Sequence, residues 1–83
     1  MSWWVYLLRC GDGTLYCGIA LDVGARLRQH REGKGAKYTR GRSPLELVYR
    51  EACGSKAEAL RRERALKRLK RPAKEALIAT GRL

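Results

Sequence analysis

Two runs rich in aromatic and branched residues, at positions 3–9 and 15–20, are separated by a short segment that contains two glycines. This pattern predicts a β-hairpin. The first run, WWVYLLR, is apolar on both of its alternating faces. A strand of that kind is covered on both sides, so we expect a sheet with other elements packed above and below it.

The length of the hairpin loop decides which side chains share a face. A two-residue loop at 12–13 would place Tyr6 and Tyr16 on opposite faces of the sheet. A three-residue loop at 11–13, with a glycine in the left-handed conformation, pairs Tyr6 with Gly18 instead. We expect this second register, which places both tyrosines on one face and leaves bare backbone opposite Tyr6.

The rest of the chain predicts three helices and a third strand. Asp22 and Ser55 are suited to cap helices, and Pro72 is suited to begin one. Residues 45–52 alternate in polarity as a strand does. Eighty-three residues allow one domain, 1–83. The order β-β-α-β-α-α predicts an α+β fold, in which a small three-stranded antiparallel sheet is flanked by helices. The expected helices span about residues 23–32, 56–69 and 72–78.

The chain carries 19 lysine and arginine residues against 8 acidic residues, a formal charge of +11. This excess predicts a polyanionic partner, and nucleic acid is favoured over a solvated basic surface without a partner. A membrane is disfavoured, because the sequence shows no run of about 18 apolar residues and no signal peptide. We therefore expect a cytoplasmic, nucleoid-associated protein that binds DNA, with RNA the less favoured partner.

Three cysteines, Cys10, Cys17 and Cys53, form an odd set without CxxC spacing. They are typical of reduced thiols in a cytosolic protein. A zinc site that combines them with the single histidine, His30, is disfavoured, because structural zinc ligands usually come in closely spaced pairs.

Glu63 stands out in the basic helix predicted for residues 56–69. At about 100° per residue it projects among Ala59, Leu60 and Leu66, on the apolar side of the helix. One interpretation is an i,i+4 ion pair with Lys67. The other is a Mg²⁺ site on a phosphate substrate, which needs one or two carboxylates while water and phosphate oxygens supply the remaining ligands. The residues alone leave both interpretations open.

Five segments together resemble a known family. They are WVY at 4–6, YCG at 16–18, RLRQH at 26–30, KYTR at 37–40 and ALRRERALK at 59–67. In type and spacing they are similar to the signature of the GIY-YIG nucleases, and the likeness covers nearly the whole chain. It is closest to the small stand-alone bacterial members. Trp4, Val5 and Cys17 depart from the two signature tripeptides at positions that are not functional side chains in the family.

The resemblance implies metal-dependent hydrolysis of a phosphodiester bond that leaves a 5′-phosphate and a 3′-hydroxyl. Glu63 would bind a single Mg²⁺ or Mn²⁺, and Arg26 would hold the non-bridging phosphate oxygens. Tyr6 would activate the attacking water, and Tyr16 would orient the water or the phosphate. His30 remains open between a satisfied core histidine and a catalytic group.

Substrate contacts are expected from a second set of residues. Gly18 would permit close approach of the substrate backbone. The basic, glycine-rich loop at 33–44 would stack an aromatic side chain on an unpaired base and grip phosphates. The residues expected to make these contacts, besides Gly18, are Lys37, Tyr38, Arg40 and Lys67.

Three functions compete. The first is a structure-specific DNA endonuclease of repair or recombination that acts on branched or flapped DNA. The second is a non-catalytic basic nucleic-acid-binding module or accessory subunit on the same scaffold, with an unidentified protein partner. The third is an RNA- or ribosome-associated protein. The combination of Tyr6, Tyr16, Arg26 and Glu63 favours the first.

Overall fold

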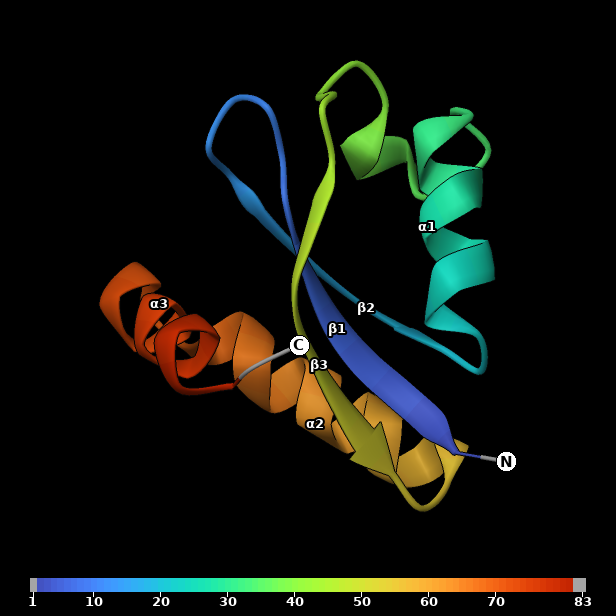
Figure 1. The fold of residues 1–83 in the computed structure, drawn as a ribbon. Helices are drawn as coiled ribbons and strands as arrows, with labels where there is room; N and C mark the ends of the chain where they lie inside the picture. The colour runs from blue at the N-terminus through green and yellow to red at the C-terminus, as the bar shows by residue number, and fades with distance from the viewer. Residues whose placement is uncertain (1, 82–83) are drawn as a thin grey trace.

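The computed structural model describes residues 2–81 and contains three strands, three α-helices and a short 3₁₀-helix (Figure 1). The strands form one antiparallel sheet in the order β2-β1-β3, so the predicted α+β fold and its element order are confirmed. Among residues 2–81, none of the helices combines the length and apolarity needed to cross a membrane. The elements are β1 (Trp3–Arg9), β2 (Leu15–Ala20), α1 (Val23–Arg31), η1 (Lys37–Thr39), β3 (Glu46–Cys53), α2 (Lys56–Arg68) and α3 (Arg71–Thr80).

The hairpin has the three-residue loop that the sequence predicts. Tyr6 pairs with Gly18, and Leu8 pairs with Tyr16. The Cys10 amide donates to the Thr14 carbonyl at 2.9 Å, and Gly13 between them has φ +86°, the left-handed conformation that favours glycine. Both tyrosines therefore lie on the same face of the sheet.

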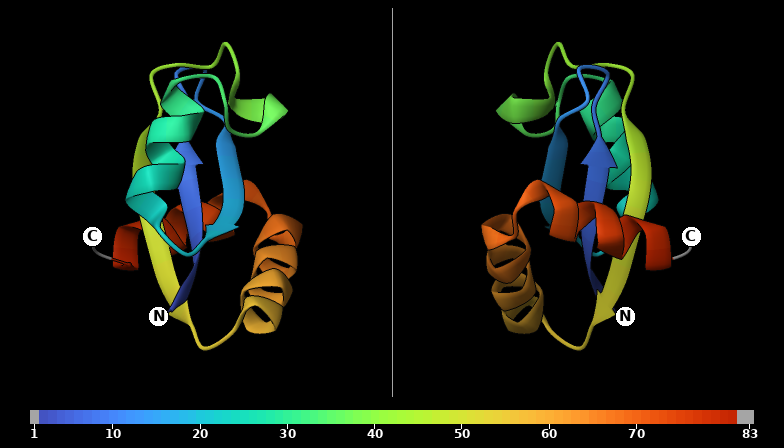
Figure 2. Two further views of the ribbon diagram at one scale, coloured as in Figure 1. Left: turned by 90° about the vertical axis from the view of Figure 1, so that its right-hand side faces the viewer. Right: turned by 90° about the vertical axis from the view of Figure 1, so that its left-hand side faces the viewer.

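The helices cover the two faces of the sheet unequally (Figures 1 and 2). On one face Val5 and Leu7 are buried against α2, whose Leu66 is also fully buried, and against α3. On the other face Tyr6 and Leu8 are buried against α1. The central strand is thus covered on both sides, as its two apolar alternations predict.

The helix caps form as predicted. The Asp22 side chain accepts from the Ala25 amide at the start of α1, and the Ser55 hydroxyl accepts from the Glu58 amide at the start of α2. One expectation about α2 is wrong: Leu60 is 41% exposed and does not belong to the apolar side of the helix. The buried face of α2 is centred on Ala59 and Leu66, and Leu60 lies outside it.

Candidate active site

Tyr6 and Tyr16 lie side by side on the face of the sheet that α1 covers, with ring centroids 6.4 Å apart. Gly18 lies beneath both rings. A Cβ at this position would stand 2.7 Å from Tyr6 Oη and 2.8 Å from Tyr6 Cζ, closer than real Cβ contacts allow, and 3.0 Å from Tyr16 Cε2, a tight contact. The two tyrosine rings are therefore what requires glycine here. The predicted approach of a substrate backbone to Gly18 stays a prediction.

His30 comes from the inner face of α1 and is 2% exposed. Its Nε2 lies 2.8 Å from Tyr6 Oη, and its Nδ1 lies 2.9 Å from the hydroxyl of Thr39 in η1. Burial, followed by the positive charge of Arg26, lowers the pKa of His30 below its usual range. His30 is thus a buried, neutral histidine that is also bonded directly to Tyr6. The two interpretations left open by the sequence are both compatible with its position.

Tyr6 is 1% exposed, and burial raises its pKa to about 12. The neighbouring Tyr16 contributes to this rise, whereas Arg26 opposes it through a hydrogen bond and through its charge. Tyr6 is therefore a neutral phenol at physiological pH in the free protein. Any role as a base requires additional positive charge at its oxygen.

Arg26 is half-buried in the middle of α1, and its Nη1 donates to Gln29 Oε1 at 2.8 Å. Its charge acts on three rings at once, because it lowers the pKa values of Tyr6, Tyr16 and His30. For Tyr16, burial outweighs this effect and raises the pKa. The guanidinium therefore lies near all three rings, at a half-buried position where it could meet a phosphate.

Glu63 comes from α2, beyond the edge strand β2, and its side chain is 19% exposed. Figure 2 (left) shows β2 between α1 and α2, and both helices contact this strand. The charges of Glu63 and Lys67 both act on the phenol of Tyr16, the carboxylate raising its pKa and the ammonium lowering it. The charge of Glu63 thus reaches Tyr16 from the far side of β2, and it also acts on Cys17, on the face of the sheet that α2 covers.

Tyr38 covers the outer side of this group. Its ring stacks on Tyr16 with centroids 5.7 Å apart and an interplanar angle of 30°. The guanidinium of Arg42 lies 4.3 Å over the Tyr38 ring and pairs with Asp12 in the hairpin loop. Lys37 and Arg40, on either side, are exposed. Residues 33–44, expected to form a loop, thus contain the short helix η1. The contacts of Tyr38 and Arg42 hold this segment against the hairpin.

Two residues of the site were missed by sequence reasoning. Thr39 is 1% exposed and bonds to His30, although its neighbours in the KYTR segment are exposed and nothing in the local pattern marks it as buried. Arg42 is one basic residue among many in its loop. One signal could have indicated Arg42. Asp12 is an acidic residue in the hairpin loop of a basic chain, so a cationic partner for it could be expected.

Glu63 fits a divalent cation in part. Its nearest charged partner, Lys67 Nζ, is 3.5 Å away, a long contact that leaves the carboxylate lone pairs available. Within residues 2–81, no group of three or more His, Cys, Asp or Glu side chains is placed to hold a metal ion. Because Mg²⁺ is often bound through one carboxylate, with water and substrate phosphate completing its shell, the donor set fits an ion that arrives with a phosphate substrate.

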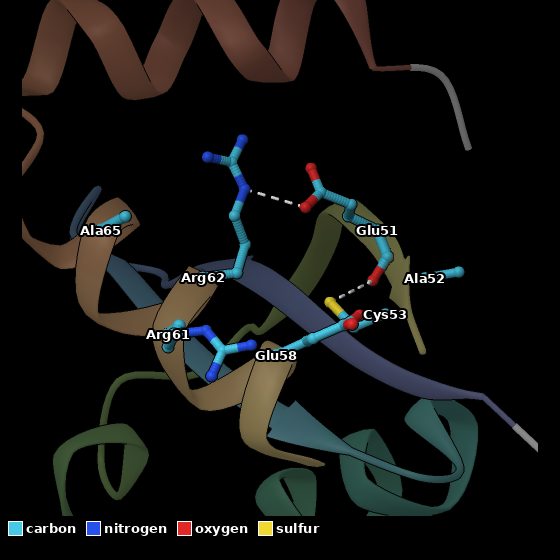
Figure 3. A pocket seen from close by; sticks show the side chains of 7 residues that line it. All are labelled: Glu51, Ala52, Cys53, Glu58, Arg61, Arg62 and Ala65. Carbon is cyan, nitrogen blue, oxygen red and sulfur yellow. Dashed lines mark hydrogen bonds and ion pairs between the residues drawn. The ribbon is translucent and has the colours of Figure 1, made fainter. Parts of the chain in front are cut away.

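A separate hollow of about 390 Å³ lies between the end of β3 and α2 (Figure 3). In it Arg62 Nε donates to Glu51 Oε2 at 2.8 Å, and Glu51 also accepts from Tyr49 at 2.6 Å. Cys53 lies on the same wall. None of the predicted site residues lines this hollow, so it is distinct from the tyrosine site.

Comparison with known proteins identifies the family of the chain. Residues 2–76 match the model of the GIY-YIG catalytic domain. UPF0213 protein SERP0126 of Staphylococcus epidermidis is 51% identical over 77 residues, which is 93% of this chain and 94% of that protein. UPF0213 protein VNG_2274C of Halobacterium salinarum is 52% identical over 74 residues, which is 89% of this chain and 96% of that protein.

Two solution NMR structures are also similar. UPF0213 protein BH0048 of Bacillus halodurans matches with a TM-score of 0.60 and 49% identity, covering 95% of this chain and 84% of that one. Protein EF2693 of E. faecalis matches with a TM-score of 0.63 and 33% identity, covering 95% and 85%. The match over residues 2–76 identifies a GIY-YIG catalytic domain, which is the domain of a nuclease family. The chain belongs to the GIY-YIG family, among small proteins that consist largely of this domain.

Proposed function

We propose that this protein is a metal-dependent endonuclease that hydrolyses phosphodiester bonds in branched or flapped DNA, within the cytoplasm and at the nucleoid, during repair or recombination. One observation carries the proposal. Tyr6, Tyr16, Arg26 and His30 meet on one face of the sheet, and a partly buried carboxylate, Glu63, lies on α2 beyond the edge strand, where its charge acts on Tyr16. The formal charge of +11 supplies attraction to DNA.

Each side chain has a physical task in this reaction. Arg26 holds the non-bridging oxygens, where negative charge grows in the transition state. Tyr6 would act as a base only as the phenolate, so its own proton first passes to an acceptor, for which His30 Nε2 lies 2.8 Å away. The phenolate would then take a proton from the attacking water, which requires the pKa of Tyr6 to fall from about 12 when substrate and cation are present. Tyr16 orients the water or the phosphate. Glu63 would hold a Mg²⁺ or Mn²⁺ ion, which supplies charge neutralisation at the phosphate and the leaving oxygen.

The exposed cations around the site serve substrate binding. Lys37 and Arg40 are exposed in the same segment as Tyr38, and Lys67 is exposed on α2 beside Glu63. Cations on both sides of the aromatic group suit a nucleic acid whose backbone crosses the edge of β2. Tyr38 offers an aromatic ring to an unpaired base at a fork or flap.

A second function has its own support. Tyr6 is almost completely buried and its pKa is about 12, which suits a structural tyrosine better than a base at neutral pH. A non-catalytic basic module, acting as an accessory subunit, would bind DNA or RNA through the same cations. It would have no use for Glu63.

The deciding experiment incubates purified protein with labelled forks, flaps, junctions and single-stranded RNA, in Mg²⁺ or Mn²⁺. We expect cation-dependent nicking of a branched DNA. Glu63→Gln should reduce the rate at least about a hundredfold, because the residue acts on the charged transition state. Glu46→Gln is the matched control, since it removes the same charge from an exposed position in β3 and should change little.

Salt-sensitive binding without cleavage in any metal would refute the endonuclease and support the binding module. Cleavage that survives Glu63→Gln would remove the metal role of Glu63. Tighter binding of RNA than of every DNA would point to the third function.

A further inference from the structure

The ring of Tyr38, which the proposed function offers to an unpaired base, already has two neighbours in the free protein. Tyr16 stacks on it with ring centroids 5.7 Å apart, and the guanidinium of Arg42 lies 4.3 Å over its centroid. Tyr38 is 42% exposed, so the ring is reachable from solvent. A base that stacks on Tyr38 therefore has to share the ring with these two side chains or displace one of them.

The two neighbours differ in how firmly they are held. Tyr16 belongs to β2, and its ring also packs against His30 with centroids 5.2 Å apart. Arg42 is a long, partly exposed side chain whose guanidinium is held by an ion pair with Asp12 in the hairpin loop. An exposed cation–π contact and an exposed ion pair each contribute little, whereas a base stacked on an aromatic ring contributes more. Arg42 is thus the neighbour that a base should displace.

This displacement requires the Arg42 side chain alone to move. The Arg42 backbone is anchored, because its carbonyl accepts from the Gly11 amide at 2.6 Å. The carboxylate of Asp12 is also held in place, since it accepts from the amide and the hydroxyl of Thr14 at 3.1 and 2.6 Å. Asp12 is exposed to water, so the loss of Arg42 leaves no buried charge without a partner. The ion pair can therefore open without any rearrangement of the two loops.

We propose that Arg42 is a substrate-binding residue that exchanges partners. The base of an unpaired nucleotide takes its place on the Tyr38 ring, and its guanidinium leaves Asp12 for a phosphate of the same strand. A guanidinium suits this exchange because its fork of donors matches a phosphate as well as a carboxylate. Asp12 then competes with the phosphate for Arg42. The inference rests on the proposed function, and it identifies an unpaired strand as the part of the substrate that this segment binds.

Nuclear magnetic resonance can follow the exchange in EDTA, where no metal-dependent cleavage occurs. Guanidinium protons over an aromatic ring resonate upfield, so those of Arg42 should be shifted upfield relative to the Tyr38→Leu variant, which lacks the ring. A short single-stranded oligodeoxynucleotide should abolish this shift at saturation and move the ring protons of Tyr38 upfield. An abasic strand of the same length should leave both in place, because it brings phosphates without a base.

Two results of this experiment would overturn the inference. One is an upfield shift of Arg42 that survives saturation with the normal strand, because the base would then bind without displacing Arg42. The other is loss of the shift with the abasic strand, because phosphate alone would then remove Arg42 and the base would have no part in it.

The affinity for the normal strand tests the competition by Asp12. Asp12→Asn weakens the hold on Arg42 and keeps an oxygen that can accept from Thr14. It should tighten binding about two- to fivefold, the range of an exposed ion pair, as measured by fluorescence anisotropy in EDTA. Glu46→Gln is the matched control. Glu46 lies opposite Arg9 at the same end of the sheet, and none of the ion pairs among residues 2–81 involves it. Its removal should tighten binding by a smaller factor.

A double-mutant cycle separates the competition from a general effect of charge. In an Arg42→Ala background, Asp12→Asn should tighten binding no more than Glu46→Gln does, because no guanidinium is left to be released. If Asp12→Asn retained its full gain in that background, Asp12 would act on the strand through its charge alone, and the exchange would be refuted.

These experiments are independent of the cleavage assay. A protein in which the strand displaces Arg42 but which cleaves no DNA in any metal refutes the endonuclease and leaves the exchange standing. A protein that nicks branched DNA while Arg42 stays on the Tyr38 ring, or that binds no single strand, refutes the exchange and leaves the endonuclease standing.

Discussion

The two faces of the sheet share the same strands but differ in how they are filled. On the α2 and α3 side, Val5, Leu7 and Leu66 pack as apolar groups. On the α1 side, Tyr6 and His30 are equally buried, yet each carries a polar atom that is hydrogen-bonded. The first face is filled mainly by apolar side chains, with the hydroxyl of Tyr49 bonded to Glu51 at its margin. The second face contains a buried polar network, which a purely structural core would not need.

The difference teaches how a chain of 83 residues accommodates a site and a core. Successive residues of β1 point to opposite faces, so one strand supplies Val5 and Leu7 to the core and Tyr6 to the site. The core and the site therefore share one strand, and neither needs a separate helix or strand. The cost is that the site and the core cannot be altered independently along this strand.

Removal of Leu66 should produce the largest effect, because it breaks the apolar face. Leu66→Ala should lower the free energy of unfolding by about 3–4 kcal/mol, as buried leucines typically do, which is a large part of the stability of a domain this small. Chemical denaturation followed by circular dichroism measures it.

Leu60→Ala is the matched control, in the same helix but at an exposed position, and should cost less than about 0.5 kcal/mol. Equal losses in the two variants would contradict the assignment of the buried face of α2.

Alkaline unfolding sharpens the comparison between the faces. Burial raises the pKa of Tyr6 from 10.0 to about 12, so between these values the unfolded chain binds fewer protons than the folded one. Stability should therefore fall as the pH rises from about 10 to 12, by about 2–3 kcal/mol from Tyr6. Tyr6→Phe should abolish this part of the loss, as measured by urea unfolding at several pH values.

Cys17, on the core face, provides the internal reference. Burial, followed by the charge of Glu63, raises its pKa from 9.0 to about 12, so its contribution to the loss begins near pH 9. Tyr6→Phe should retain this earlier decline. Parallel curves for wild type and Tyr6→Phe above pH 10 would show that Tyr6 does not titrate as its burial indicates.

The sequence predicts the local parts of the fold well. The hairpin register depends on a three-residue loop and one left-handed glycine, and the starts of α1 and α2 depend on the side chains of Asp22 and Ser55. All of these interactions join residues close together in the chain. Short-range chemistry therefore suffices to predict them.

The parts that the sequence does not predict join distant residues. The contact of Thr39 with His30 depends on how the segment after α1 folds back, and the stacking of Tyr38 on Tyr16 depends on the same path. The exposure of Leu60 depends on how α2 is rotated against the sheet, which helical periodicity does not determine to within one residue. The resemblance to a family indicated which residues meet, but not these supporting contacts.

Gly18→Ala should give the smallest of the three effects. It tests the site face, which is the face of the sheet that α1 covers and that carries Tyr6 and Tyr16. A Cβ there would press on Tyr6 Oη and Cζ, at 2.7 and 2.8 Å, and Tyr6 is too buried to move freely. Overpacking of this kind should cost about 2 kcal/mol and disturb the Tyr6–His30 hydrogen bond, visible as a change in the ring ¹⁵N shifts of His30.

Gly24→Ala is its control, because that glycine lies exposed in α1 and a Cβ would make only an ordinary contact of 3.5 Å with Asp22. Alanine is the better helix former, so this variant should gain roughly 0.5–1 kcal/mol and leave the His30 shifts unchanged. If Gly18→Ala had the same effects on stability and on the His30 shifts as Gly24→Ala, the two tyrosine rings would be able to accommodate an added methyl group. The site face would then be packed more loosely than the core face, and the glycine of the second signature tripeptide would need a reason outside the free protein, such as the approach of a substrate.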